Sequence, residues 1–335
     1  MVEFTQKLRL SRAREIFRRF LRHENALLIV VLVALIASMS IITHGLTTRV
    51  ENIINVLLQS SIRGVASAGQ AFVILTAGID VSVGGIGVMC ALLGAGLMTE
   101  DTYVNYIGHP VSLYLVIPLM LLVGAGWGAI NGFSVSRLMM PPLIVTLAMW
   151  EITKGAGFIM SRGVYLAKQP RALAILGGSG TIAGLPLPVI IFAVVAAIGY
   201  FVLNHTSFGR SIYAVGGNPL SAWLSGIEVK RVRLTAYVVS GFLAGLAGVL
   251  MTARTMSASL QTLAGLELDT IAAVCVGGIS LMGGKGSLIG AVIGVLIIGV
   301  INNAMSILGA GPGLQGTAKG AIIFSAVAVD FLRRR

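Results

Sequence analysis

The sequence predicts an all-α integral membrane protein with about ten transmembrane helices. Hydrophobic residues occupy 56% of the 335 positions and charged residues only 11%, whereas soluble proteins carry about a quarter charged residues. The mean hydropathy is +0.94. The apolar residues also gather in runs that are about as long as the 17–25 residues needed to cross a bilayer. These observations exclude a soluble enzyme, a disordered chain and a disulfide-stabilised domain.

The first apolar run, residues 26–43, follows a segment in which apolar side chains recur every three or four residues between arginines. This pattern is typical of a basic amphipathic helix on a membrane surface, and we expect it within residues 1–25. A cleaved signal peptide is the competing interpretation, but its apolar region would be only about 7–15 residues long. We therefore predict a retained span here and further spans at residues 53–76, 81–99, 112–136, 142–160, 187–203, 234–253, 267–282, 287–308 and 315–331.

Residues 26–332 are expected to form one transmembrane domain, followed by a basic tail at residues 333–335. With both termini in the cytoplasm, sixteen Lys and Arg residues lie in cytoplasmic segments and five on the opposite side. This asymmetry fits the positive-inside rule. The net charge of +12 therefore reflects membrane topology and does not indicate a nucleic-acid-binding surface.

Glycines spaced four residues apart mark the faces where we expect helices to contact one another, because small residues let helix backbones approach closely in lipid. A different group, Gly78, Gly84 and Gly85, flanks Asp80 and predicts a broken helix whose freed backbone N–H groups the carboxylate can reach. We expect Asp80 to be mainly structural, with substrate contact as the alternative. The spaced glycines are Gly124, Gly128 and Gly132, Gly241 and Gly245, Gly290 and Gly294, and Gly316 and Gly320.

Two glycine-rich segments are similar to nucleotide-binding motifs but lack the required context. Residues 311–316 match G-x-G-x-x-G, yet they join two apolar runs and follow no strand. Residues 283–287 lack the first glycine of a phosphate-binding loop, and Lys285 is followed by glycine. The four histidines share no metal-ligand spacing. We therefore expect no catalytic residue, metal site or cofactor in this chain.

The longest cytoplasmic loop, residues 204–233, is predicted to contain a short helix parallel to the membrane. Asn218 can cap a helix that begins at Pro219 and runs to Ser225, and Gly226 can end it in the left-handed conformation. Such a helix forms a compact protruding element that another protein can bind and displace. The residues that we expect to carry this coupling are Gly216, Gly217, Asn218, Pro219, Leu220, Trp223, Leu224 and Gly226.

Four segments also follow one another in a characteristic order. They are Gly78-Ile-Asp-Val-Ser-Val-Gly84, Pro142-Leu-Ile-Val-Thr-Leu147, Phe208-Gly-Arg-Ser-Ile-Tyr-Ala-Val-Gly-Gly-Asn218 and Gly277-Gly-Ile-Ser-Leu-Met-Gly-Gly-Lys-Gly286. From about residue 50 onwards, the chain resembles the permease subunits of ribose-type ABC sugar importers, which are inner membrane components of binding-protein-dependent transport systems.

The resemblance implies that a monosaccharide or similar small polyol is imported by alternating access across the bacterial inner membrane. It also implies three partners. These are a second permease subunit in a homodimer or heterodimer, an ATPase with two nucleotide-binding halves that carries ATP and Mg²⁺, and a periplasmic sugar-binding protein.

Polar residues inside the spans are candidates for the transport pathway, although each could equally form an interhelical hydrogen bond. Two other functions stay open: an ion- or proton-coupled secondary transporter that uses Asp80, Glu151 and Lys154, and a scaffold or channel without an energy source. We expect Glu151 and Lys154, one helical turn apart, to pair with each other or to face water. The pathway candidates are Asn55, Gln59, Ser60, Gln70, Thr76, Asp80, Asn131, Thr146, Glu151, Asn302 and Asn303.

Overall fold

The computed structural model describes residues 25–332, without the side chains of residues 312, 326 and 329–331. The predicted amphipathic segment and the arginine tail therefore lie outside the described residues, except for Asn25. Within these limits the fold is all-α, as predicted. The strands found there are β1 (Thr181–Ile182) and β2 (Leu185–Pro186), which form a small antiparallel hairpin.

Each predicted span contains one helix, and the loop at residues 204–233 contains two more that begin and end in it. The helices of the predicted spans are α2 (Ala26–Ile42), α3 (Val50–Leu75), α4 (Val83–Met98), α5 (Leu113–Ser136), α6 (Pro142–Ser161), α7 (Leu187–His205), α10 (Val229–Thr255), α11 (Leu266–Val276), α12 (Leu288–Ile307) and α13 (Pro312–Leu332). The other helical elements are α8 (Ser207–Gly217), α9 (Pro219–Leu224), η1 (Leu46–Thr48), η2 (Arg171–Leu173) and η3 (Ile175–Ser179).

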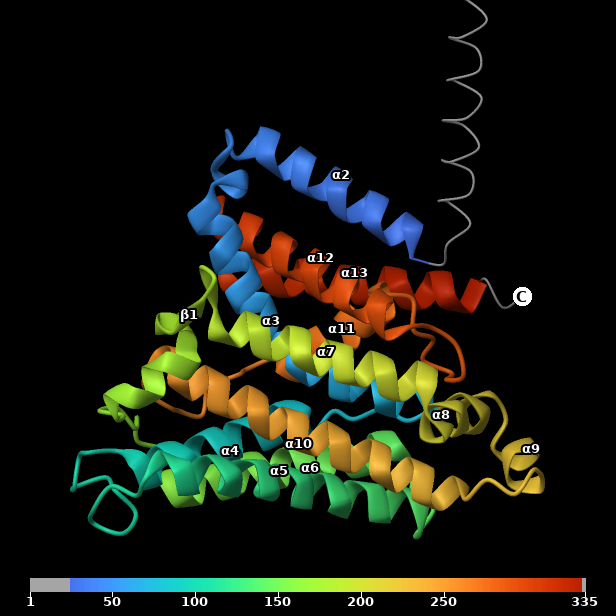
Figure 1. Cartoon of the computed structure of the whole chain (residues 1–335), viewed down its shortest axis with the longest axis horizontal. Coiled ribbons are helices and arrows are strands. Elements are labelled where there is room, and N and C mark those ends of the chain that lie inside the picture. The colour runs from blue at the N-terminus through green and yellow to red at the C-terminus, as the bar shows by residue number, and fades with distance from the viewer. Residues whose placement is uncertain (1–24, 333–335) are drawn as a thin grey trace, which may run out of the picture.

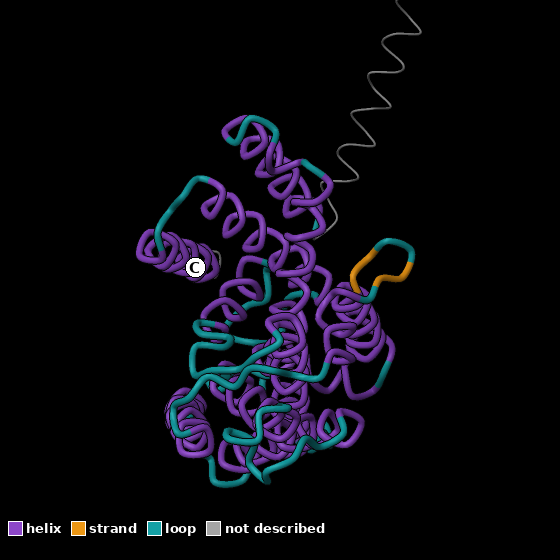
Figure 2. Tube along the Cα trace, turned by 90° about the vertical axis from the view of Figure 1, so that its left-hand side faces the viewer, coloured by secondary structure: helices purple, strands orange, loops and turns teal. Residues whose placement is uncertain are grey.

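The long helices lie side by side (Figure 1), and the view from the side confirms a bundle with the hairpin at its edge (Figure 2). Helices α8 and α9 lie at one end of the bundle, together with the start of α2 and the end of α13. Five described helices, α5, α6, α7, α10 and α12, are long and apolar enough to cross a membrane, and α2 and α4 are shorter apolar helices.

The predicted break near Gly78 is confirmed. Helix α3 ends at Leu75 and α4 begins at Val83, so seven residues without helical structure separate them. Ala77 adopts a left-handed conformation with φ of +60°, which an L-residue with a Cβ adopts only at a cost. The helix resumes before Gly84, slightly earlier than the glycines alone indicated.

The prediction of a continuous span at residues 267–282 is wrong. Helix α11 ends at Val276, and residues 277–287 form an irregular segment before α12. Four glycines in this segment have positive φ, which glycine tolerates because it has no Cβ. Residues 277–287 thus form a second irregular segment, comparable to the break between α3 and α4. These four glycines are Gly278, Gly283, Gly284 and Gly286.

Helix α10 runs through the centre of the bundle, against α3, α4 and α5. Its contact with α5 is made by the predicted glycines, because a Cβ on Gly124 would lie 2.5 Å from the carbonyl oxygen of Gly241. Gly290 and Gly294 likewise approach the backbone of α11. The prediction does not hold within the subunit for Gly316 and Gly320, around which a Cβ would meet no atom within 4 Å.

Candidate translocation and coupling site

Helix α9 forms as the sequence predicted and ends one residue earlier, at Leu224. The Asn218 side chain accepts hydrogen bonds from the backbone N–H groups of Leu220 and Ser221, both at 3.0 Å. Pro219 is the first helical residue. Gly226 follows the helix with φ of +83°. These local features explain why so short a helix is defined, because its free backbone groups at both ends are satisfied.

The outer surface of α9 is strongly apolar. Leu220 and Trp223 are each 64% exposed and Leu224 is 71% exposed, while Ala222 packs inward. Three large apolar side chains on one short helix form an exposed patch, and such patches mark interaction sites when they are not covered by lipid. This patch lies at the end of the bundle (Figure 1), where it is available to another protein.

Helix α8 connects α9 to the bundle through closely packed backbone. Gly216, near the end of α8, is buried, and a Cβ there would overlap the carbonyl oxygen of Leu75 and lie 2.5 Å from the amide nitrogen of Gly284. The Gly284 N–H donates to that same carbonyl at 3.0 Å. Because Leu75 ends α3 and Gly284 belongs to the segment between α11 and α12, three chain segments meet at one point. We call this contact the glycine junction.

Two further contacts extend the glycine junction. The Tyr213 hydroxyl donates to the carbonyl oxygen of Gly286 at 3.0 Å. A Cβ on Gly283 would lie 2.6 Å from the amide nitrogen of Ala77, so the two broken segments also touch each other. The backbones of α8 and of both irregular segments therefore meet without a flexible side chain between them.

Asp80 stabilises the break between α3 and α4. Its side chain is 0% exposed. One carboxylate oxygen accepts hydrogen bonds from the backbone N–H of Ser82 at 3.0 Å and from the Ser82 hydroxyl, and the other accepts from the Ser240 hydroxyl of α10 at 2.8 Å. The expected contact with a freed backbone N–H is thus present. Asp80 has no access to solvent in this conformation.

Other candidate residues support the same irregular segment. Asn131 donates to the Ser82 hydroxyl at 2.7 Å, and Thr146 donates to the carbonyl of Ile79 at 3.3 Å. Gln70 donates to the backbone carbonyl of Asp80 at 3.0 Å and accepts from its N–H at 3.3 Å. Thr76 donates to the Val73 carbonyl at 2.8 Å. All four side chains are buried. They hold the break in place and do not line an open surface.

Polar residues in the first half of α3 have different surroundings. Asn55 is exposed, accepts from Gln59 at 3.1 Å and lies 3.5 Å from Arg254. Asn303 of α12 exchanges two hydrogen bonds of 2.9 Å with Asn52 and so links α12 to α3. Buried Ser60 and Asn302 have no hydrogen-bond partner for their side-chain polar atoms among the described residues.

Three charged side chains meet inside the bundle at α3, α11 and α13. Asp269 is 4% exposed, and its carboxylate lies 3.1 Å from Arg63 Nε and 2.8 Å from Lys319 Nζ. A charge near the middle of a membrane helix costs roughly 2.5–3.5 kcal/mol on insertion scales, which explains why the charges are paired. Sequence spacing gave no signal for this cluster, because its members come from distant parts of the chain.

The expected pairing of Glu151 with Lys154 is not found, since no ion pair joins them in the described part of the chain. Glu151 is exposed on the surface of the subunit. Lys154 Nζ lies 4.0 Å from the centroid of the Trp150 ring, and Lys154 lines the same hollow as Glu267 of α11. Lys154 therefore contacts the aromatic face of Trp150, one turn earlier on the same helix, and not Glu151.

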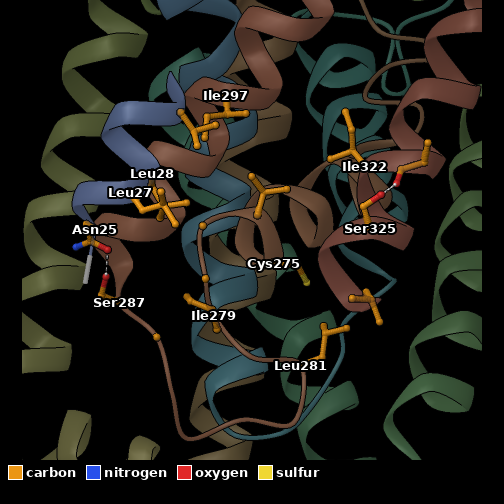
Figure 3. A pocket seen from close by; sticks show the side chains of 17 residues that line it. Asn25, Leu27, Leu28, Cys275, Ile279, Leu281, Ser287, Ile297, Ile322 and Ser325 are labelled. Atoms are coloured by element: carbon orange, nitrogen blue, oxygen red, sulfur yellow. Dashed lines mark hydrogen bonds between the residues drawn. The ribbon is translucent and has the colours of Figure 1, made fainter. Parts of the chain in front are cut away.

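The cavity drawn in Figure 3 has a volume of about 700 Å³ and is bounded by α2, α12, α13 and the segment before α12. Its labelled side chains are mainly apolar. Asn25 accepts from Ser287 at 3.1 Å, and Ser325 donates to the Ala321 carbonyl at 2.8 Å. Because these polar groups already bond to protein, the cavity is poorly suited to a polyol.

Comparison with known proteins gives the class of the chain. The family described as branched-chain amino acid transport system / permease component matches residues 52–327, and the chain belongs to this family. It is therefore a multi-pass permease of the inner membrane, with a role in translocation and not in catalysis. No solved structure matches the chain.

Similar curated proteins are named for sugar import. The chain is 37% identical to the ribose import permease protein RbsC of Haemophilus influenzae, with 90% of this chain and 91% of the relative covered. It is 35% identical to the fructose import permease protein FrcC of Rhizobium meliloti (90% and 84% covered). It is 37% identical to the D-allose transport system permease protein AlsC of Escherichia coli (91% and 90% covered).

Proposed function

We propose that the chain is the translocation subunit of an ATP-driven importer for a monosaccharide or a similar small polyol. The relatives named for ribose, fructose and D-allose support this substrate class. The structure adds a physical argument, because Glu151 and Lys154 lie near the middle of α6 on a surface that the subunit leaves open. Charged groups at this depth need water or another protein surface, and a route for a hydrated solute supplies both.

The proposed importer contains further subunits. A second permease, identical or homologous, covers the open face of α6. ATP with Mg²⁺ is hydrolysed by a separate ATPase with two nucleotide-binding halves, and a periplasmic sugar-binding protein delivers the substrate. Both termini are placed in the cytoplasm, which is supported by the position of α8, α9 and the start of α2 at one end of the bundle (Figure 1).

The observation that carries the proposal is the connection between the exposed α9 and the two irregular segments. An ATPase that moves α9 would displace α8, and the glycine junction would pass this displacement to the C-terminal end of α3 and to residues 277–287. Irregular backbone at membrane depth is tolerated where it is enclosed in protein or lines a cavity. We infer that its rearrangement opens and closes the route for the solute.

The alternative of an ion-coupled carrier is not favoured. It needs Asp80 to bind and release an ion, but Asp80 is enclosed and accepts hydrogen bonds from three donor groups. Glu151 and Lys154 do not form the expected pair. The exposed apolar patch on α9 also has no purpose in a carrier that works without an ATPase.

Leu224→Asp tests the proposed function. The charge would lie in the contact with the ATPase, where a desolvated, unpaired carboxylate is costly. We expect co-purification with the ATPase and ATP-driven sugar uptake to fall at least about tenfold, since buried interface anchors contribute about 2 kcal/mol or more. Membrane insertion and protein amount should stay normal.

Leu138→Asp is the matched control, because Leu138 is an exposed leucine (58%) in the loop between α5 and α6. It introduces the same charge at the same end of the bundle but outside α9. If Leu224→Asp still binds the ATPase and transports as well as Leu138→Asp does, the coupling role of α9 is wrong.

A further inference from the structure

A hollow of about 350 Å³ lies between α4, α6 and the segment that leads into α11. Its wall combines two aromatic side chains, Trp150 and Phe158, with the polar side chains of Lys154, Gln261 and Glu267. This composition differs from that of the cavity in Figure 3, whose labelled lining is mainly apolar. Small-molecule sites typically join an apolar wall to a few placed polar groups, in volumes of about 300–1,000 Å³.

The position of the hollow indicates contact with water. Trp150 and Lys154 lie near the middle of α6, and Glu267 lies in the first turn of α11. Lys154 and Glu267 are partly exposed and Gln261 is exposed. Since ionisable groups at membrane depth face the protein interior or a water-filled space, the hollow opens towards such a space and not towards lipid.

The Glu267 carboxylate lies against the backbone of α4. It shares the wall of the hollow with Trp150 and Lys154. Gly84 lies directly opposite, where a Cβ would overlap the carboxylate oxygen Oε2. An ionised carboxylate offers about four acceptor positions, so it can accept hydrogen bonds from hydroxyl groups of a molecule in the hollow.

The Trp150 ring presents a face that is electrostatically negative. The Lys154 ammonium lies 4.0 Å from its centroid, a cation–π contact that is worth more where water is excluded. The C–H groups on one face of a sugar ring carry a weak positive charge and can replace the ammonium there. The Lys154 ammonium would then donate hydrogen bonds to sugar hydroxyl oxygens at the rim of the hollow, and the Glu267 carboxylate would accept hydrogen bonds from sugar hydroxyl groups.

We propose that this hollow is a low-affinity monosaccharide subsite with Trp150 as its platform. Lys154 acts as an internal competitor for the indole face, which keeps binding weak and favours release, and Glu267 orients the hydroxyl groups. This inference rests on the proposed function, and it assigns the substrate contact to α6 and α11 instead of to Asp80.

The test compares Trp150→Leu, Trp150→Phe and Lys154→Gln in the complete importer, with uptake of radiolabelled D-ribose, D-fructose and D-allose. Binding of D-ribose to the permease–ATPase complex is measured separately by saturation-transfer NMR. We expect Trp150→Leu to reduce both sugar uptake and the NMR signal of bound D-ribose about fivefold or more, because an aromatic contact is removed. Trp150→Phe should retain about half or more, and Lys154→Gln should strengthen the NMR signal about twofold or more.

The outcomes separate this inference from the proposed function. If the wild-type importer takes up none of the three sugars and no other monosaccharide or small polyol, both fail. If wild-type uptake is present but Trp150→Leu matches Trp150→Phe in both assays, the subsite alone is wrong. If Trp150→Leu does not assemble with its ATPase, the Lys154→Gln variant tests the subsite instead. An unchanged or weaker NMR signal for D-ribose with Lys154→Gln overturns the proposal.

Discussion

Asp80 shows how one side chain can stabilise a break in a membrane helix. A break leaves backbone N–H and C=O groups without helical partners, and each is costly to leave unpaired in the membrane. Asp80 accepts from Ser82 within the break and from Ser240 on α10. The Tyr237 hydroxyl, also on α10, donates to the Ile79 carbonyl at 3.3 Å. The break is thus anchored to the central helix, which defines its position.

Asp80→Ala should destabilise the folded protein by at least about 2 kcal/mol, because buried donors that lose their acceptor cost about 1–3 kcal/mol each. Asp80→Asn retains an acceptor oxygen and should cost less. Thermal unfolding in detergent measures both, with Asp101→Ala as the control for a partly exposed aspartate, paired with Lys168, in the loop after α4. An Asp80→Asn protein that is fully stable but transports nothing would instead place Asp80 on the transport route.

At the scale of single elements, the local sequence accounts for most of the helices but not for their partners. Asn218, Pro219 and Gly226 defined α9 because capping depends on neighbouring residues. Residues 277–282 were wrongly included in a span because Ile279, Leu281 and Met282 are apolar, whereas Gly277 and Gly278 mark the end of the helix. Glu151 and Lys154 were expected to pair with each other or to face water, and Glu151 is exposed whereas Lys154 lies over Trp150 of the same helix. Only Glu267, which comes from α11, is brought to this place by the fold.

Helix α8 offers a direct test of the glycine junction, because two adjacent glycines differ in their surroundings. A Cβ on Gly216 would overlap the Leu75 carbonyl oxygen, but a Cβ on Gly217 would meet no atom within 4 Å. Gly216→Ala should push α8 away from Leu75 and Gly284. Overpacking of this kind costs about 1–3 kcal/mol, and we expect sugar uptake to fall about tenfold while the ATPase still binds.

Gly217→Ala separates packing from backbone freedom. It should keep most of the uptake, because alanine fits the open space and favours a helix over glycine. Uptake and ATPase co-purification are measured for both variants side by side. Equal losses in both would mean that the region works as a flexible hinge, and the glycine junction would not transmit the motion.

For the whole molecule, the side chains exposed on the isolated subunit are of two kinds: apolar ones suited to lipid and charged ones that need water or another protein. An apolar residue such as Leu122 of α5, which is 69% exposed, is suited to lipid. Glu151 of α6 is also exposed, but its charge is not suited to lipid. The subunit therefore has one side that faces the bilayer and another that requires water or a second permease, and the asymmetry follows from the chemistry of α5 and α6.

Cysteine labelling can distinguish the two sides in the assembled importer. Gly155→Cys lies in the wall of the hollow, at an exposed position without neighbours within 4 Å, and Leu122→Cys lies near the middle of α5. Both are made after replacement of Cys90 and Cys275 by alanine. A membrane-impermeant maleimide needs a thiolate in water, so we expect it to label Gly155→Cys at least about tenfold faster than Leu122→Cys, whose thiol would stay protonated in lipid. Equal rates would mean that water does not reach the hollow in the assembled importer, which would remove the physical support for a transport route along α6.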